Sequence, residues 1–254
     1  FLDRRLSLGV DLYSQDRSYS DYELKRLGTA ISLGTSLGGP NRLDFRYRLE
    51  RTRISDVADT NEYIDAEGKA FYFGQEALTL SSLGTFVSRD TRDKFNVPTR
   101  GNRVSGGGTL YGGPLGFDAQ LYSLEASGVQ YFPLWLKHVI SLRAQAEVIE
   151  TYGDQEEVPL SERLFIGGAR TIRGFKYRNV GPKAERADGK LDSARPSGGQ
   201  SLALASAEYM VPVVQNVRLT GFCDAGNVWY DAYEFDLGKL AVGYGLGLRF
   251  DIPM

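Results

Sequence analysis

Hydrophobic and polar residues alternate along most of this sequence, which is the period-two pattern of β-strands. Within residues 139–148, Ile140 and Leu142 fall on one side of an extended chain, and Arg143 and Glu147 fall on the other. Comparable alternation recurs from one end of the chain to the other. The segments run to about 10 residues or more, which is longer than the usual strand of about 5–6 residues in globular proteins.

The alternating segments predict about ten strands, separated by connections of unequal length. The predicted strands cover residues 5–16, 27–37, 42–56, 76–90, 102–112, 117–131, 137–151, 201–213, 216–229 and 240–252. Connections that alternate between short and long are typical of outer-membrane barrels, with short turns inside and long loops outside. The longest predicted loops are 57–75 and 152–200. A soluble β-sandwich would alternate too, but its strands are shorter. The prediction is therefore an all-β fold, a transmembrane antiparallel β-barrel.

Composition narrows the function classes. No run of 18 or more apolar residues predicts a transmembrane helix, whereas a membrane-spanning β-strand needs only about 9–11 residues. A formal net charge of −2 is not the global basic field of a nucleic-acid binder. One histidine and one cysteine leave no ordinary zinc site built from those ligands. We therefore expect no zinc site of that kind.

Three glycines in the last predicted strand, Gly243, Gly245 and Gly247, superficially resemble a phosphate-binding loop. They lie inside an alternating strand and no helix follows, so the nucleotide interpretation fails its structural context. Alternate glycines on an inner wall instead leave room for an inserted loop, and that is the interpretation favoured here.

The connection 152–200 is too long for a simple turn, and long loops in compact domains are usually functional or disordered. Its second half, 183–200, is polar and rich in glycine, serine and proline, which predicts flexibility. Alternation places Glu208 and Asp224 on the polar faces of two later strands. A lumenal arginine beside two lumenal carboxylates would be a paired arrangement, as partly buried charges require.

The first half of the same loop resembles the hallmark of the BamA superfamily of outer-membrane barrels. That hallmark is a Gly-Gly pair followed by a (Val/Ile)-Arg-Gly-(Phe/Tyr) tetrad, and here it is matched by Gly167, Gly168, Ile172, Arg173, Gly174 and Phe175. The resemblance implies that residues 152–200 fold back into the barrel lumen. It also implies that Arg173 meets Glu208 and Asp224 on the inner wall.

Two further motifs extend the resemblance over nearly the whole chain. Asp224, Gly226 and Trp229 match the family's Phe-x-Asp-x-Gly-x-x-Trp strand. An inner-turn motif of the family is matched by Arg89, Asp90, Arg92, Pro98 and Gly101. The tetrad alone would be a weak signal, but the tetrad with its acidic pair and the ordered turns is a strong one.

The resemblance implies that residues 1–254 form part of a barrel of about sixteen strands, without about the first four and the last two. The implied function is an outer-membrane protein assembly factor that folds and inserts client β-barrels in a Gram-negative bacterium. The resemblance implies that it is no enzyme, with no catalytic group, no metal and no cofactor. The alternative is a polypeptide-transporting pore of the two-partner secretion or translocation-assembly type. Implied partners are unfolded outer-membrane clients, accessory lipoproteins that bind through periplasmic domains, and outer-membrane lipid and lipopolysaccharide, but no nucleic acid.

Basic residues near the outer rim add one candidate contact with lipopolysaccharide. They are Lys25, Arg26, Arg51 and Arg53. Their side chains could meet lipopolysaccharide phosphates, or they could be ordinary solvated charges at the rim, and the sequence leaves both interpretations open.

Overall fold

Ten long antiparallel strands form one continuous sheet in the computed structural model, which describes residues 6–19, 22–56, 63–64, 70–71, 76–186, 194–214 and 216–250. The strands are β1 (Leu6–Ser18), β2 (Glu23–Gly38), β3 (Asn41–Ser55), β6 (Glu76–Asp90), β7 (Gly101–Tyr111), β8 (Leu121–Pro133), β9 (Val139–Thr151), β12 (Ser201–Val214), β13 (Val217–Trp229) and β14 (Ala241–Phe250). They pair in that order. The predicted all-β antiparallel fold is confirmed.

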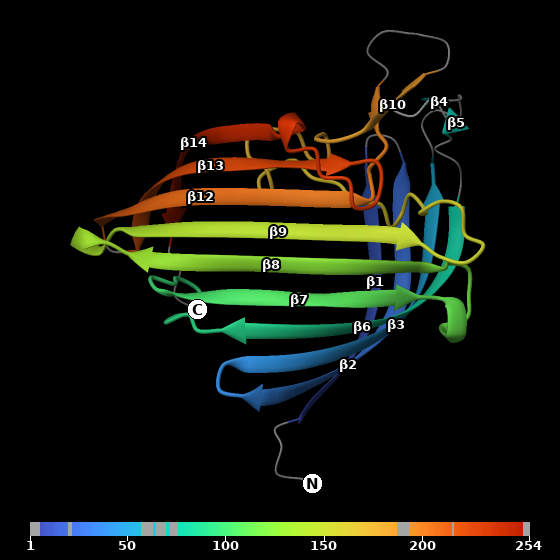
Figure 1. Ribbon diagram of the computed structural model, residues 1–254, viewed down its shortest axis with the longest axis horizontal. Coiled ribbons are helices and arrows are strands. Elements are labelled where there is room, and N and C mark those ends of the chain that lie inside the picture. Colours follow the sequence, from blue (N-terminus) through green and yellow to red (C-terminus); the bar gives the residue numbers. More distant parts are fainter. Residues whose placement is uncertain are drawn as a thin grey trace.

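The sheet curves into a trough, with β1–β3 rising on one side and β12–β14 on the other (Figure 1). Its outer face is apolar and exposed, as Leu12 and Tyr244 illustrate. The outer edges of β1 and β14 pair with no other strand in the described part of the chain. Among the same residues, no helix is both long and apolar enough to cross a membrane.

The start of β8 differs from the prediction. A strand was predicted from residue 117, but β8 begins at Leu121. The chain first turns through a short 3-10 helix, Gly113–Leu115, and Gly112 and Phe117 both have positive φ (63° and 73°). A Cβ on Gly112 would lie 1.7 Å from the Ala119 carbonyl oxygen. This tight crossing of two chain segments delays the strand.

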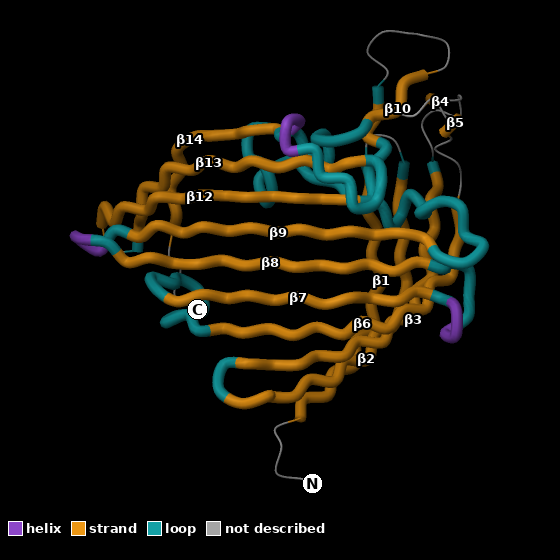
Figure 2. The backbone as a smooth tube through the Cα atoms, in the orientation of Figure 1, coloured by secondary structure: helices purple, strands orange, loops and turns teal. Residues whose placement is uncertain are grey.

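The two long loops contain strands that the sequence pattern did not predict. β4 (Tyr63–Ile64), β5 (Ala70–Phe71), β10 (Lys183–Arg186) and β11 (Arg195–Pro196) form a second sheet in the order β11-β10-β4-β5. It stands at the loop end of the trough (Figure 2). Two parts of the segment 183–200, expected to be flexible, thus lie in strands: β10 and β11 pair with each other, and β10 also pairs with β4 of the other loop. Residues 187–193 lie outside the described part.

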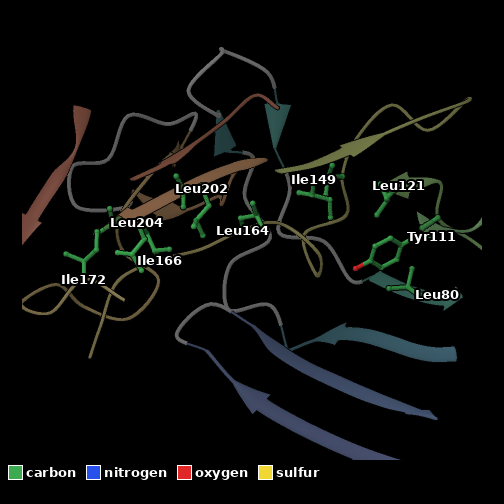
Figure 3. Close-up of a cluster of buried hydrophobic side chains, with 13 residues drawn as sticks. Leu80, Tyr111, Leu121, Ile149, Leu164, Ile166, Ile172, Leu202 and Leu204 are labelled. Atoms are coloured by element: carbon green, nitrogen blue, oxygen red, sulfur yellow. The ribbon is translucent and has the colours of Figure 1, made fainter. Parts of the chain in front are cut away.

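The core lies between the inner face of the sheet and the loop that follows β9. A single cluster joins loop residues such as Leu164, Ile166 and Ile172 to Leu80 and Leu121 of the strands (Figure 3). Full burial of such a side chain stabilises a fold by about 1.5–3 kcal/mol. The loop thus does for the inner face what a second sheet does in a sandwich, and this packing positions its tip.

Candidate functional site

The tip of the loop is a tight turn built on two glycines. Gly167 and Gly168 have φ values of 123° and 93°, in the region that favours glycine. A Cβ on Gly167 would lie 2.4 Å from the Lys176 carbonyl oxygen. The turn is closed by hydrogen bonds from the Gly167 amide to Thr171 Oγ1 (2.8 Å) and from the Gly168 amide to the Ile172 carbonyl (3.1 Å). The turn leaves Ile172 fully buried and the next residue facing the wall.

Arg173 meets that wall through its backbone and its side chain. Its Nε and Nη2 donate to Asp224 Oδ2 (2.7 Å) and Oδ1 (2.6 Å), which is a bidentate pair. Its backbone amide donates to Asp224 Oδ2 (3.1 Å), and its Nη1 donates to Glu208 Oε1 (2.7 Å). The structure therefore brings together the three charged residues named from the sequence.

The two carboxylates are buried, so each requires a charged partner. The Asp224 side chain is 0% exposed and that of Glu208 is 8% exposed. A buried carboxylate without its partner would cost several kcal/mol, so the arginine and the two acids are mutually required. The hydrogen bond to Asp224 raises the pKa of the Arg173 guanidinium, although partial burial opposes that shift. Arg173 accordingly stays a cation at any physiological pH.

Three residues that sequence reasoning did not assign to the site help to complete it. Ser206 Oγ donates to Asp224 Oδ1 (2.6 Å) and accepts from Arg173 Nη2 (3.2 Å). The Arg173 guanidinium lies 3.7 Å from the centre of the Phe222 ring, a cation–π contact. Arg249 donates to both oxygens of Glu208, at 2.7 and 2.5 Å.

Gly243 also belongs to the site, because a Cβ there would lie 2.1 Å from the Arg173 carbonyl oxygen. Of the three glycines that were expected to make room for the loop, only Gly243 does so. A Cβ on Gly245 would instead meet the Phe222 ring, and one on Gly247 would meet nothing within 4 Å. The sequence could have indicated two of these residues. Ser206 and Phe222 each lie two positions before an acidic residue of the site, and therefore share its face of the strand.

The other residues of the loop and strand motifs do not pair with the acidic residues of the site. Gly174 has a φ of 91°, and Phe175 is 37% exposed. Gly226 has a packing role, since a Cβ there would lie 2.5 Å from the Ala203 carbonyl oxygen and 3.3 Å from Ile172 Cδ1. Trp229 is buried near the outer rim, where its Nε1 donates to the Asp236 carbonyl (3.2 Å).

The inner-turn motif forms a separate structure between β6 and β7. Arg92 binds Asp90 in a bidentate pair at 2.9 and 2.6 Å. Gly101 has a φ of 88°, and a Cβ there would lie 2.2 Å from the Thr91 carbonyl oxygen. Pro98 is buried, while Arg89 is exposed at the end of β6. These residues shape the turn and do not contact Arg173.

Asp93 organises the same turn. It accepts from the Thr99 amide (2.8 Å), the Thr99 hydroxyl (2.6 Å) and the Arg100 amide (3.2 Å). Partial burial would raise the pKa of the Asp93 carboxyl, but these hydrogen bonds outweigh it and lower the pKa to about 2. Asp93 thus caps the turn as a carboxylate.

The suggestion that Arg26 meets lipopolysaccharide is wrong. Arg26 points into the lumen, where it pairs with Glu50 (3.5 Å) and Glu162 (3.2 Å). β2 begins at Glu23, four residues before the predicted start, so alternation sends Lys25 outward and Arg26 inward. Lys25 is exposed, as are the two β3 arginines of the predicted rim patch. In the described residues no group of three or more His, Cys, Asp or Glu side chains could hold a metal ion.

Comparisons with known proteins agree with this architecture. The family model described as "Omp85 superfamily domain" matches residues 1–254. The chain is similar to "Outer membrane protein assembly factor BamA" of Nitratidesulfovibrio vulgaris, with 27% identity over 99% of this chain and 31% of the relative. The protein of that name in Neisseria meningitidis is 26% identical over 95% of this chain and 33% of the relative. The chain thus spans about a third of the length of these curated relatives.

A solved structure supports the fold. The crystal structure of BamA from Haemophilus ducreyi lacking POTRA domains 1-3 superposes with a TM-score of 0.81. The match covers 98% of this chain and 53% of that chain, at 23% identity. A "SAM50-like protein" of Schizosaccharomyces pombe is 30% identical over 68% of this chain and 38% of the relative.

Proposed function

The chain belongs to the Omp85 superfamily, and from that premise we propose that it forms the larger part of the barrel of a protein assembly factor in the outer membrane of a Gram-negative bacterium. The relatives that match nearly all of the chain carry the name of such a factor. The activity belongs to a protein about three times as long as this chain, so the barrel is proposed as one working part of it.

The observation that carries the proposal is the buried Arg173–Asp224–Glu208 anchor inside an otherwise continuous apolar-faced sheet. A diffusion pore needs a water-filled lumen, which a loop packed against the inner wall would narrow. A machine that must keep one part of its wall fixed while another part opens does gain from such a loop. We propose that the anchored loop holds the β12–β14 wall while client strands are admitted elsewhere.

The admission step would use backbone pairing. An exposed strand edge can template an incoming strand by β-augmentation, which needs no nucleotide and no covalent chemistry. The clients would be unfolded outer-membrane barrels, and accessory lipoproteins would bind periplasmic domains of the longer protein. Lipid and lipopolysaccharide would surround the outer face, where Lys25, Arg51 and Arg53 remain exposed.

The edges of the described sheet support a larger barrel. Each unpaired backbone group in lipid costs several kcal/mol, so β1 and β14 cannot face the bilayer with bare edges. We propose that about four further strands precede β1 and about two follow β14, giving the about sixteen strands implied by the family resemblance. The opening seam would then lie between strands outside this chain.

Depletion of the full-length protein tests the assembly role. We expect the levels of other outer-membrane β-barrels to fall, measured by quantitative mass spectrometry of outer-membrane fractions. The Arg173→Ala and Asp224→Ala variants should fail to restore those levels, whereas the matched loop variant Glu156→Ala should restore them. Unchanged barrel levels together with the loss of one secreted polypeptide would instead establish the transport-pore alternative.

A further inference from the structure

The lumenal loop is held at a second place, on the opposite side of the trough. Glu162, whose side chain is only 6% exposed, lies between two arginines of the far wall. Its Oε1 lies 3.2 Å from Arg26 Nη2 on β2, and its Oε2 lies 3.9 Å from Arg48 Nη2 on β3. Arg26 also donates to the Ser161 carbonyl (2.5 Å). Both the backbone and the side chain of the loop therefore contact β2.

A buried carboxylate of the far wall already shares one of these arginines. Glu50 on β3 is 2% exposed and receives hydrogen bonds from the Tyr13 hydroxyl (2.6 Å) and the Thr52 hydroxyl (3.0 Å). It also pairs with Arg26 (3.5 Å). One carboxylate of the wall cannot balance two arginines, so the carboxylate of Glu162 supplies the missing charge.

An aromatic contact lies beside this ionic one. The Arg178 guanidinium lies 3.4 Å from the ring centre of Phe165 in the same loop and 4.2 Å from that of Tyr19, just beyond β1. Tyr177 stacks on Tyr19 with an interplanar angle of 9°. A partly desolvated cation between two rings is a favourable contact of about 1–2 kcal/mol. It fastens the loop to the end of β1.

We propose that the loop is a cross-brace: Arg173 fastens it to β12–β14, and Glu162 with Arg178 fastens it to β1–β3, so that it sets the distance between the two walls. Four strands, β6 to β9, separate these walls in the sheet. A curved sheet of ten strands can flex about its long axis, and a tie across the lumen removes that freedom. Glu162 and Arg178 are positioning residues, because they act on the shape of the barrel.

The electrostatics favour positioning over simple stabilisation. Burial raises the pKa of the Glu162 carboxyl, against the opposing charges of Arg26 and Arg48. The desolvation cost of the carboxylate is therefore not fully offset by its partners. Replacing a buried ion pair with apolar side chains is often neutral or stabilising, so such a pair is weak evidence for a contribution to the free energy of unfolding. Loss of the second anchor should change the wall distance more clearly than it changes overall stability.

Pulsed EPR on the full-length protein in lipid nanodiscs tests the brace. Labels at Lys25→Cys and Val242→Cys, two exposed positions on the opposite walls, report the distance in a Cys223→Ser background. We expect the combined variant Glu162→Gln, Arg178→Ala to broaden the distance distribution and shift its mean. The matched variant Glu156→Gln, Arg170→Ala changes the same residue types at exposed loop positions and should leave the distribution unchanged.

A second measurement follows the loop itself. Trypsin cleavage after Lys176 should accelerate about tenfold in the Glu162→Gln, Arg178→Ala variant, a fold-change equivalent to about 1.4 kcal/mol. Folding is checked by heat-modifiable electrophoretic mobility, which should be normal. An unchanged distance distribution in a folded variant would overturn the brace. No client is present in either measurement, so that outcome would leave the assembly function untouched.

Discussion

Two bidentate arginine–aspartate pairs in this chain have the same shortest distance but differ in how exposed the carboxylate is. Arg173–Asp224 in the lumen and Arg92–Asp90 in the inner turn both reach 2.6 Å. The Asp224 side chain is 0% exposed, whereas that of Asp90 is 39% exposed. Loss of a partner costs about 3–5 kcal/mol when the remaining charge is buried but about 0–1 kcal/mol when water can replace it. Burial of the carboxylate, rather than contact geometry, therefore distinguishes the Arg173–Asp224 pair from the Arg92–Asp90 pair.

The largest effect should come from Arg173→Ala. It leaves Asp224 buried without its cation, so we expect a loss of about 3–5 kcal/mol in the free energy of unfolding. Urea titration of the protein in detergent or lipid, followed by electrophoretic mobility, measures it. A loss below about 1 kcal/mol would mean that the lumenal pair behaves like a surface pair.

Gly243→Ala should have the next largest effect. The new Cβ would lie 2.1 Å from the Arg173 carbonyl oxygen, which is a backbone atom and cannot swing aside. We expect a destabilisation of about 1–3 kcal/mol by overpacking, together with weaker protection of the Arg173 amide from hydrogen exchange. Gly247→Ala is the matched control, because nothing lies within 4 Å of its Cβ.

Arg92→Ala should change the free energy of unfolding by about 0–1 kcal/mol. The same urea titration measures it, and Arg173→Ala serves as the comparison. If both substitutions cost the same, burial is not what distinguishes the two pairs.

The smallest effect should be a titration in the inner turn. The lowered pKa of Asp93 means that its contribution is fully present above the unfolded value of about 3.9 and is lost as pH falls through about 2. The amide resonances of Thr99 and Arg100 should therefore stay constant from pH 7 to about pH 4 and shift below that. Asp93→Asn should abolish the shift, while a midpoint near 4 would contradict the lowered pKa.

The sequence predicted the sheet well because period-two alternation persists over strands of 10 to 16 residues. The prediction failed where the position of a strand end decided on which face of the sheet a residue lies. The predicted strand 27–37 omitted four residues of β2, so Arg26 was placed at the rim although alternation from Glu23 turns it inward. The two-residue strands β4, β5 and β11 are too short to carry periodicity, and they form by pairing within each loop and, between the loops, through β10 and β4.

The candidate site divides in the same way. Arg173, Glu208 and Asp224 were found through the family resemblance and the polar faces of two strands. The second anchor was not, because alternation assigns Glu50 and Arg48 to a face without saying which loop residue reaches them. Contacts such as Arg26 with Glu162, 136 residues apart, depend on the curvature of the sheet.

Gly243 also bears on the order of folding. The Arg173 carbonyl fits against β14 only because that glycine has no side chain, and the Arg173 amide binds Asp224 of β13, 51 residues along the chain. The complete set of contacts around Arg173 therefore needs β13 and β14 side by side. Contacts of such long sequence separation form slowly. Docking of the loop should be a late kinetic phase of folding, preceded by a sheet whose lumen is still open.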